Sequence, residues 1–213
     1  MSTLADVECA LGVIAFALTR DGAPSGRADF DAALCSSQGR HALRSKVTLL
    51  HCVTQYPAPP ESVNLRAMDT LAQAFGLPVG YSDHTLGSAV ALAAVARGAT
   101  VIEKHFTLDR SLPGPDHAAS LEPTELKQLV ADIRVVVRAL GSVYKAPAAA
   151  EIGNREVARR SIVAARPIAR GDAFTLDALD FKRPGSGITP AACWDLLGRP
   201  AQRDYASDEQ IEP

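Results

Sequence analysis

The sequence lacks the features that mark several classes of protein. No apolar run approaches the roughly 20 residues that a membrane-spanning helix needs, and the N-terminus lacks the charged-then-apolar order of a signal peptide. No basic block stands out, and the formal net charge is -2, from 22 basic and 24 acidic residues. We therefore expect no nucleic acid and no membrane as a partner, and a soluble chain in the cytoplasm.

Cysteine is scarce and never paired closely in sequence. The four cysteines, Cys9, Cys35, Cys52 and Cys193, form no CxxC motif, which argues against a zinc ribbon or a thioredoxin-like dithiol. Their wide spacing suits a reducing compartment. We expect each of them to be a small buried hydrophobe.

What is present is enough apolar sequence for a packed core. The chain has 213 residues, of which 47% are hydrophobic and 22% charged, so it can form one large domain or a larger and a smaller one. Residues 3–18 are predicted to be an amphipathic helix with Thr3 as N-cap, followed by a loop at 21–26 and a second helix around 28–45. Apolar residues recur at helical spacing at Leu4, Val7, Leu11, Ile14 and Leu18.

Three apolar runs, each followed by a helical pattern, indicate an α/β fold with a parallel sheet. Polar residues follow each run, and the C-terminal ends of parallel strands are where barrel enzymes assemble their sites. Three strands are too few to close a barrel, which needs about eight. We therefore predict a partial (β/α)8 TIM barrel that holds only the later strands. The runs are 47–52, 79–82 and 100–106, and the helices are 64–75, 87–97 and 122–140.

The pattern changes near residue 141. Residues 142–157 carry alanine and proline without a clear period and are predicted to be a linker. Residues 158–213 form a turn-rich segment with short strands predicted at 160–165 and 180–182. We expect a small β-rich domain there, separate from a first domain at 1–141.

Two histidines form the first candidate site. His84 and His105 are 21 residues apart, one strand–helix repeat, so the two imidazoles can lie side by side at the mouth of a barrel. With Glu103 and Asp116 they would make a mixed nitrogen and oxygen site, which suits Mn²⁺ or Mg²⁺ better than structural zinc. The alternative is that each histidine only forms hydrogen bonds near a strand end.

Four segments follow one another along the chain: LLHCVTQYPAP, GYSDHTLG, VIEKHFTLDRSLPGPDHAASLEP and FKRPGSGI. They resemble the signatures of the sialic acid synthase family. That family condenses phosphoenolpyruvate with N-acetylmannosamine or a related amino sugar and releases phosphate, on a TIM barrel followed by an antifreeze-like, or SAF, domain. The PGPD loop is more similar to the neuraminate and legionaminate synthases than to the pseudaminate branch.

The resemblance implies a metal-dependent transferase of sialic, or nonulosonic, acid biosynthesis. His84 and His105 would bind the divalent ion, expected to be Mn²⁺ with Mg²⁺ or Co²⁺ as alternatives. Glu103 and Asp116 would act as catalytic residues around the metal and the acceptor sugar.

The resemblance also implies four substrate contacts. Thr54 and Ser82 match positions that hold phosphoenolpyruvate, and Tyr56 would contact a substrate. Arg183 matches an arginine of the SAF domain that reaches into the partner subunit's site and holds the N-acyl group of the sugar. The expected partner is therefore a second copy of the chain in a domain-swapped homodimer.

The chain departs from the family at its beginning. Relatives have a longer N-terminal part, whereas Met1 aligns with the middle of the barrel, so we expect a truncated or split synthase that needs a fragment supplying the missing strands and is weakly active or inactive alone. Lys46 and Lys104 are expected to be solvated. A non-catalytic SAF-domain binding or assembly module, or a different metal-dependent aldolase, remain as alternatives.

Overall fold

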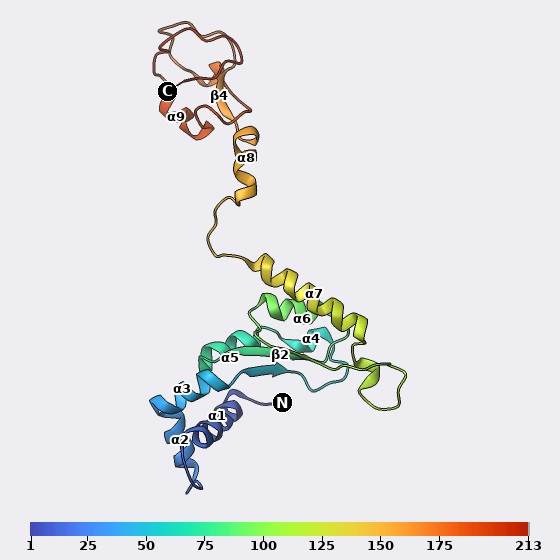
Figure 1. The fold of residues 1–213 in the computed structure, drawn as a ribbon. Coiled ribbons are helices and arrows are strands. Elements are labelled where there is room, and N and C mark those ends of the chain that lie inside the picture. Colours follow the sequence, from blue (N-terminus) through green and yellow to red (C-terminus); the bar gives the residue numbers. More distant parts are fainter. Residues whose placement is uncertain (213) are drawn as a thin grey trace. The chain divides into compact units, whose positions relative to one another are not determined.

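The computed structural model describes residues 1–212, in two units (Figure 1). The first unit is Met1–Gly141 and the second begins at Ser142. The first unit combines helices with a parallel sheet, and the second is built around a short antiparallel pair of strands. Each unit has its own hydrophobic clusters, so each is described by itself below.

The first unit begins with helix α1, Leu4–Thr19, which confirms the predicted N-terminal helix. Thr3 is its N-cap: the Asp6 backbone N–H donates to the Thr3 hydroxyl over 3.3 Å, and the Thr3 backbone N–H donates to the Asp6 carboxylate over 2.8 Å. This reciprocal capping box satisfies two amide groups that a helix start leaves without partners. It also holds the pKa of the Asp6 carboxyl below its usual value, because the Thr3 hydroxyl and backbone amide donate to the charged form.

The single helix predicted around 28–45 is wrong, because the structure has two. They are α2, Arg27–Cys35, and α3, Ser37–Lys46. Between them Ser36 takes an extended conformation, and its hydroxyl accepts from the Gly39 backbone N–H at 2.9 Å. A serine that caps the next helix ends the previous one, and the periodicity of apolar residues does not register that break.

Three parallel strands form the sheet of the first unit, in the order β1–β2–β3. They are β1, Leu49–Cys52, β2, Val79–Asp83, and β3, Ile102–Lys104. The three predicted strands are thus confirmed, and β3 is shorter than the apolar run that predicted it. Beyond β3 an isolated parallel bridge joins Phe106 to Leu121.

Helices cover one face of this sheet. They are α4, Pro60–Val63, α5, Ala67–Phe75, α6, Ala89–Ala96, and α7, Pro123–Leu140. Val79 and Tyr81 of β2 pack with side chains of α4, α5 and α6 in one cluster, and a second cluster joins α6 to α7, which run side by side in Figure 1. Because side chains alternate along a strand, residues 80, 82 and 84 turn toward the opposite face.

The second unit contains helix α8, Ala149–Ala158, and strands β4, Ser161–Ala164, and β5, Leu179–Lys182, paired antiparallel. Both strands were predicted. The segment predicted to be a linker contains α8. A core of ten buried residues, among them Ile162 and Tyr205, packs around β4. Short helical turns complete the unit: η2, Leu176–Ala178, η3, Pro190–Ala192, and α9, Cys193–Leu196.

The expectation that all four cysteines are buried is wrong for two of them. Cys193 is buried and Cys52 half-buried, whereas Cys9 and Cys35 are exposed. Cys9 lies two residues before the buried Leu11 of α1, which places it on the opposite side of a helix with 3.6 residues per turn. Between residues 1 and 212, no helix has both the length and the hydropathy that spanning a bilayer requires.

Candidate active site

The ends of β2 and β3 bring His84 and His105 together. The parallel register pairs Ser82 with Glu103 and Asp83 with Lys104, so the next residue on each strand is a histidine. The two imidazole rings lie edge to face, with centroids 5.1 Å apart and planes at 81°. The predicted proximity of the two histidines is therefore present in the structure.

His84 is held in one orientation. Its Nδ1 lies 2.7 Å from the Val53 carbonyl oxygen, which can only accept, so Nδ1 carries the proton and Nε2 keeps its lone pair. The Ala58 backbone N–H donates to the His84 carbonyl over 2.9 Å. The residue is only 9% exposed. A ring nitrogen fixed by a carbonyl in this way is the common arrangement of a metal-binding histidine.

Tyr56 covers the histidine pair. Its ring centroid lies 4.1 Å from that of His84 and 5.2 Å from that of His105. The residue follows β1, so the loops after all three strands contribute to one cluster. Tyr56 remains 46% exposed, which leaves its hydroxyl accessible to a ligand beside the imidazoles.

Ser82 and Glu103 form a second contact on the same face of the sheet. The Ser82 hydroxyl donates to the Glu103 carboxylate over 2.6 Å. Ser82 is buried, while Glu103 is exposed. Alternation along each strand places this pair on the face that His84 and His105 also occupy. The structure thus gathers five of the predicted site residues: Tyr56, Ser82, His84, Glu103 and His105.

On the opposite face, Asp83 and Lys104 form a buried ion pair, so the prediction that Lys104 is solvated is wrong. The Lys104 Nζ donates to the Asp83 carboxylate over 2.8 Å, and the two side chains are 4% and 0% exposed. Burial is possible because the register places a carboxylate directly opposite the ammonium group. Lys46 is exposed, as predicted. The neighbouring Tyr81 has a raised pKa, mainly because its phenol is buried and secondly because the charge of Asp83 is close.

Two predicted residues of the first unit lie outside this cluster, and a third belongs to the second unit. Thr54 is exposed just after β1, and Asp116 is exposed in the segment between β3 and α7. Arg183 belongs to the second unit, where it lines a cavity of about 520 Å³ with Pro184 and three residues of α8: Asn154, Val157 and Ala158. The described residues place neither Thr54 nor Asp116 in a hydrogen bond with either histidine.

The donor set at the histidines suits an open metal site. Over residues 1–212, no group of three or more histidine, cysteine, aspartate or glutamate side chains is arranged to hold a metal ion. Two imidazoles can nevertheless anchor a divalent ion whose other positions are filled by water or substrate oxygen. The fixed Nδ1 of His84 and its available Nε2 fit that use.

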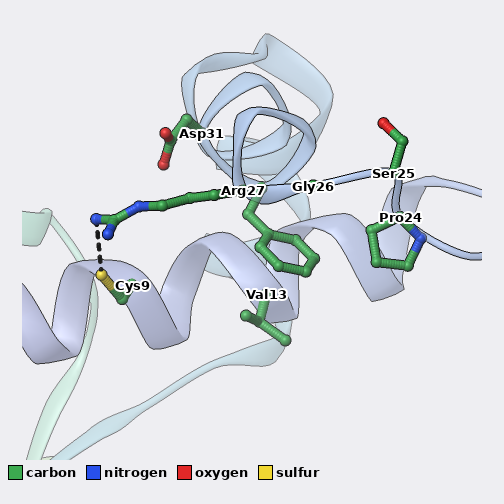
Figure 2. Close-up of a pocket in the computed structure, with 8 residues that line it drawn as sticks. Cys9, Val13, Pro24, Ser25, Gly26, Arg27 and Asp31 are labelled. Carbon is green, nitrogen blue, oxygen red and sulfur yellow. Dashed lines mark hydrogen bonds between the residues drawn. The ribbon is translucent and has the colours of Figure 1, made fainter.

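A separate cavity of about 430 Å³ lies between α1 and α2 (Figure 2). Val13, Pro24 and Phe30 give it apolar walls, and at one end the Arg27 guanidinium donates to the Cys9 sulfur over 3.2 Å. None of the predicted site residues lines this cavity.

Comparison with known families and proteins covers both units. Residues 1–145 match the NeuB family and residues 159–213 match the SAF domain. The chain is 50% identical over 170 residues to the N,N'-diacetyllegionaminic acid synthase of Campylobacter jejuni, covering 80% of this chain and 51% of that protein. It is 40% identical over 171 residues to the N-acetylneuraminate-9-phosphate synthase of Homo sapiens, covering 79% and 48%.

Solved structures give the same picture. A putative spore coat polysaccharide biosynthesis protein E from Chromobacterium violaceum matches with a TM-score of 0.61 and 28% identity, over 95% of this chain and 62% of that one. The N-acetylneuraminic acid synthetase of Leptospira borgpetersenii matches with a TM-score of 0.52 and 36% identity, over 68% and 51%. The chain spans about half the length of the curated relatives that it matches.

Proposed function

The chain belongs to the NeuB family and carries a SAF domain, and from this we propose that it serves nonulosonic acid synthesis. In the proposed reaction, C3 of phosphoenolpyruvate forms a bond with the aldehyde carbon of an N-acylated amino sugar such as N-acetylmannosamine. Water then adds at C2, and cleavage of the C2–O bond releases phosphate. The observation that carries the proposal is the convergence of His84 and His105 at the ends of neighbouring parallel strands.

The histidine pair is proposed to hold a divalent cation, with Mn²⁺ as the first candidate and Mg²⁺ or Co²⁺ as alternatives. Such an ion supplies Lewis-acid polarisation of the sugar's carbonyl oxygen. The Val53 carbonyl keeps His84 in the tautomer that leaves Nε2 available. Tyr56, packed on both rings, limits their rotation and shields the site from water.

The remaining residues of the cluster are proposed to handle the substrates. Ser82 is a buried hydroxyl on the same face of the sheet as the histidines, and together with Thr54 it would bind phosphoenolpyruvate by turning its single O–H from Glu103 to the substrate. Glu103 accepts from Ser82 over 2.6 Å, so it orients the hydroxyl before the substrate binds and would add negative charge beside a bound cation. Asp116 is proposed to complete the acceptor-sugar site.

Arg183 is proposed to act across a dimer. Its side chain is exposed in the second unit beside a cavity, and a guanidinium suits the recognition of an amide oxygen or a carboxylate. In the proposed homodimer it would contact the N-acyl group of a sugar bound to the partner copy.

The first unit is proposed to be the later part of a TIM barrel, over residues 1–141, joined by 142–157 to a β-rich SAF domain at 158–213. Three parallel strands with polar residues at their C-terminal ends support this, and closure needs about eight strands. We propose that the other strands lie outside these residues, upstream in the same protein or on a separate fragment. A cytoplasmic location belongs to the proposal, because Cys9 and Cys35 are free and exposed, as a reducing compartment permits.

A reconstitution assay tests the function. The full chain is mixed with phosphoenolpyruvate, N-acetylmannosamine or N,N'-diacetylated amino sugars, and Mn²⁺, with and without the N-terminal half of the Campylobacter jejuni relative. We expect metal-dependent phosphate release and a nine-carbon product by mass spectrometry in the reconstituted sample. His105→Gln should abolish turnover, whereas His41→Gln, on the exposed side of α3, should not.

Two results would count against the proposal. Phosphate release that persists without a divalent ion, or in His105→Gln, would remove the metal mechanism. Silence in every reconstituted sample, together with stable binding of the chain to a full-length synthase, would favour a non-catalytic assembly module instead.

A further inference from the structure

One ammonium group ties together the two segments that carry the histidines. The Lys104 Nζ donates to the Asp83 carboxylate over 2.8 Å and to the Thr85 carbonyl over 2.6 Å. Asp83 and Thr85 are the residues on either side of His84, and Lys104 directly precedes His105. The Lys104 side chain therefore binds the carboxylate of one neighbour of His84 and the backbone carbonyl of the other, while Lys104 itself belongs to the strand that ends at His105.

Hydrogen bonds between Asp83 and Thr85 also stabilise the end of β2. The second carboxylate oxygen of Asp83 accepts from the Thr85 backbone N–H and from the Thr85 hydroxyl, each over 2.8 Å. Asp83 and Thr85 are each 1% exposed. The backbone from 83 to 85 is thus closed into one hydrogen-bonded turn, with the His84 side chain projecting from its middle toward the other face of the sheet.

The burial of this ion pair sets it apart. The other ion pairs of residues 1–212 join side chains that are 37% exposed or more. Removing two charges from water is costly, and well-packed apolar side chains often hold two strands together as well or better. Directed hydrogen bonds also fix the position of one strand end relative to the other, and a site made of two histidines needs that fixed position.

We propose that Asp83, Thr85 and Lys104 are positioning residues that set the distance and orientation between His84 and His105. They lie on the helix-covered face of the sheet, away from the histidine side chains, so they act through the backbone and not by touching a ligand. The inference rests on the proposed function, because it concerns the same pair of imidazoles. Its test is chosen to give a result even where no metal binds.

The test compares the native full chain with the double variant Asp83→Asn/Lys104→Met, which removes both charges at nearly constant volume. The first readout, without metal, is nitrogen-15 NMR of the His84 ring, which reports the tautomer. The second is the dissociation constant for Mn²⁺, from the EPR signal of the free ion. The matched control is Arg97→Met, which breaks the exposed pair with Asp69 that joins α6 to α5.

We expect the native His84 ring to show one tautomer, protonated at Nδ1, and the double variant to show an averaged signal. The Mn²⁺ dissociation constant should rise about ten- to 100-fold, as for the loss of outer contacts of a metal ligand. Arg97→Met should change neither readout. A folded double variant with the native tautomer and a dissociation constant within about twofold of native would overturn the proposal.

Two further outcomes are a double variant that does not fold and a native chain that binds no Mn²⁺. If the double variant does not fold, Thr85→Val decides: it removes only the hydroxyl that donates to Asp83, and an unchanged tautomer and Mn²⁺ affinity in that variant overturn the proposal. If the native chain binds no Mn²⁺ while the double variant still loses its single tautomer, the metal site of the proposed function fails and the positioning role is supported.

Discussion

The rings of His84 and His105 meet edge to face, with centroids 5.1 Å apart, although 21 residues separate them in the chain. Neither ring reaches the other through a local turn: each follows the last residue of a strand, and the two strands are in register. The site is therefore a product of sheet pairing, and changes that disturb the pairing should disturb the site.

Replacing one histidine should remove Mn²⁺ binding. His84→Gln takes away one of two nitrogen ligands, and a single imidazole holds Mn²⁺ only weakly, so titration calorimetry should show no measurable uptake. His41→Gln is the control, since His41 is exposed on α3. Equal binding by both variants would contradict the assignment of the metal site.

Gly80→Ala should destabilise the first unit. A Cβ at this position would lie 2.5 Å from both the Val101 carbonyl oxygen and a Leu50 methyl group, and the backbone oxygen cannot move without separating the strands. We expect a loss of about 1–3 kcal/mol in the free energy of unfolding, measured by urea denaturation followed by circular dichroism.

Gly153→Ala provides the contrast. Gly153 lies within α8, and a Cβ there would meet no atom within 4 Å. Alanine in a helix interior is favoured over glycine by about 0.5–1 kcal/mol, so this variant should be as stable as the native chain or more so. A destabilised Gly153→Ala variant would show that other atoms pack against α8 at this position.

Tyr81 should make stability fall at alkaline pH. Burial, and then the charge of Asp83, raises the pKa of its phenol in the folded chain. The unfolded chain therefore loses this proton first, so the contribution is present below pH about 10 and is lost as the pH rises further. Ultraviolet titration should show a late ionisation step, and Tyr81→Phe should remove that step and flatten the alkaline decline in stability.

Ile162→Ala should destabilise the second unit. Ile162 is fully buried at the centre of its core, and deleting such a side chain leaves a cavity that costs about 2–5 kcal/mol. The only tryptophan, Trp194, lies in this unit, so its fluorescence during denaturation reports the change. Ile152→Ala, at a side chain that is 59% exposed on α8, should leave the transition within about 0.5 kcal/mol of native.

The strands and the histidine pair could be predicted because their signals lie in the type and spacing of residues along the chain. Apolar runs mark buried parallel strands, and a spacing of one strand–helix repeat places His84 and His105 at neighbouring strand ends. The N-cap of α1 could likewise be predicted, because Thr3 is followed three residues later by Asp6.

What could not be predicted depends on partners that only folding supplies. Lys104 was expected to be solvated because lone lysines usually are, yet the same spacing of 21 residues relates it to Asp83. The spacing alone does not show that the two side chains face each other and are buried. The break between helices at Ser36 and the exposure of Cys9 on α1 depend on where the folded helices end and which side they bury, and the spacing of apolar residues does not give either.

The two cross-strand pairs also determine which insertions and deletions the chain can tolerate. Ser82 with Glu103 fixes the alignment of β2 and β3 on one face, and Asp83 with Lys104 fixes it on the other. One residue added within 81–84 would turn Asp83, the partner of Lys104, toward the face of the histidines, and it would turn His84 toward the helices. Length changes between the sites should therefore be confined to the loops that flank α6, where the alignment of the strands is unaffected.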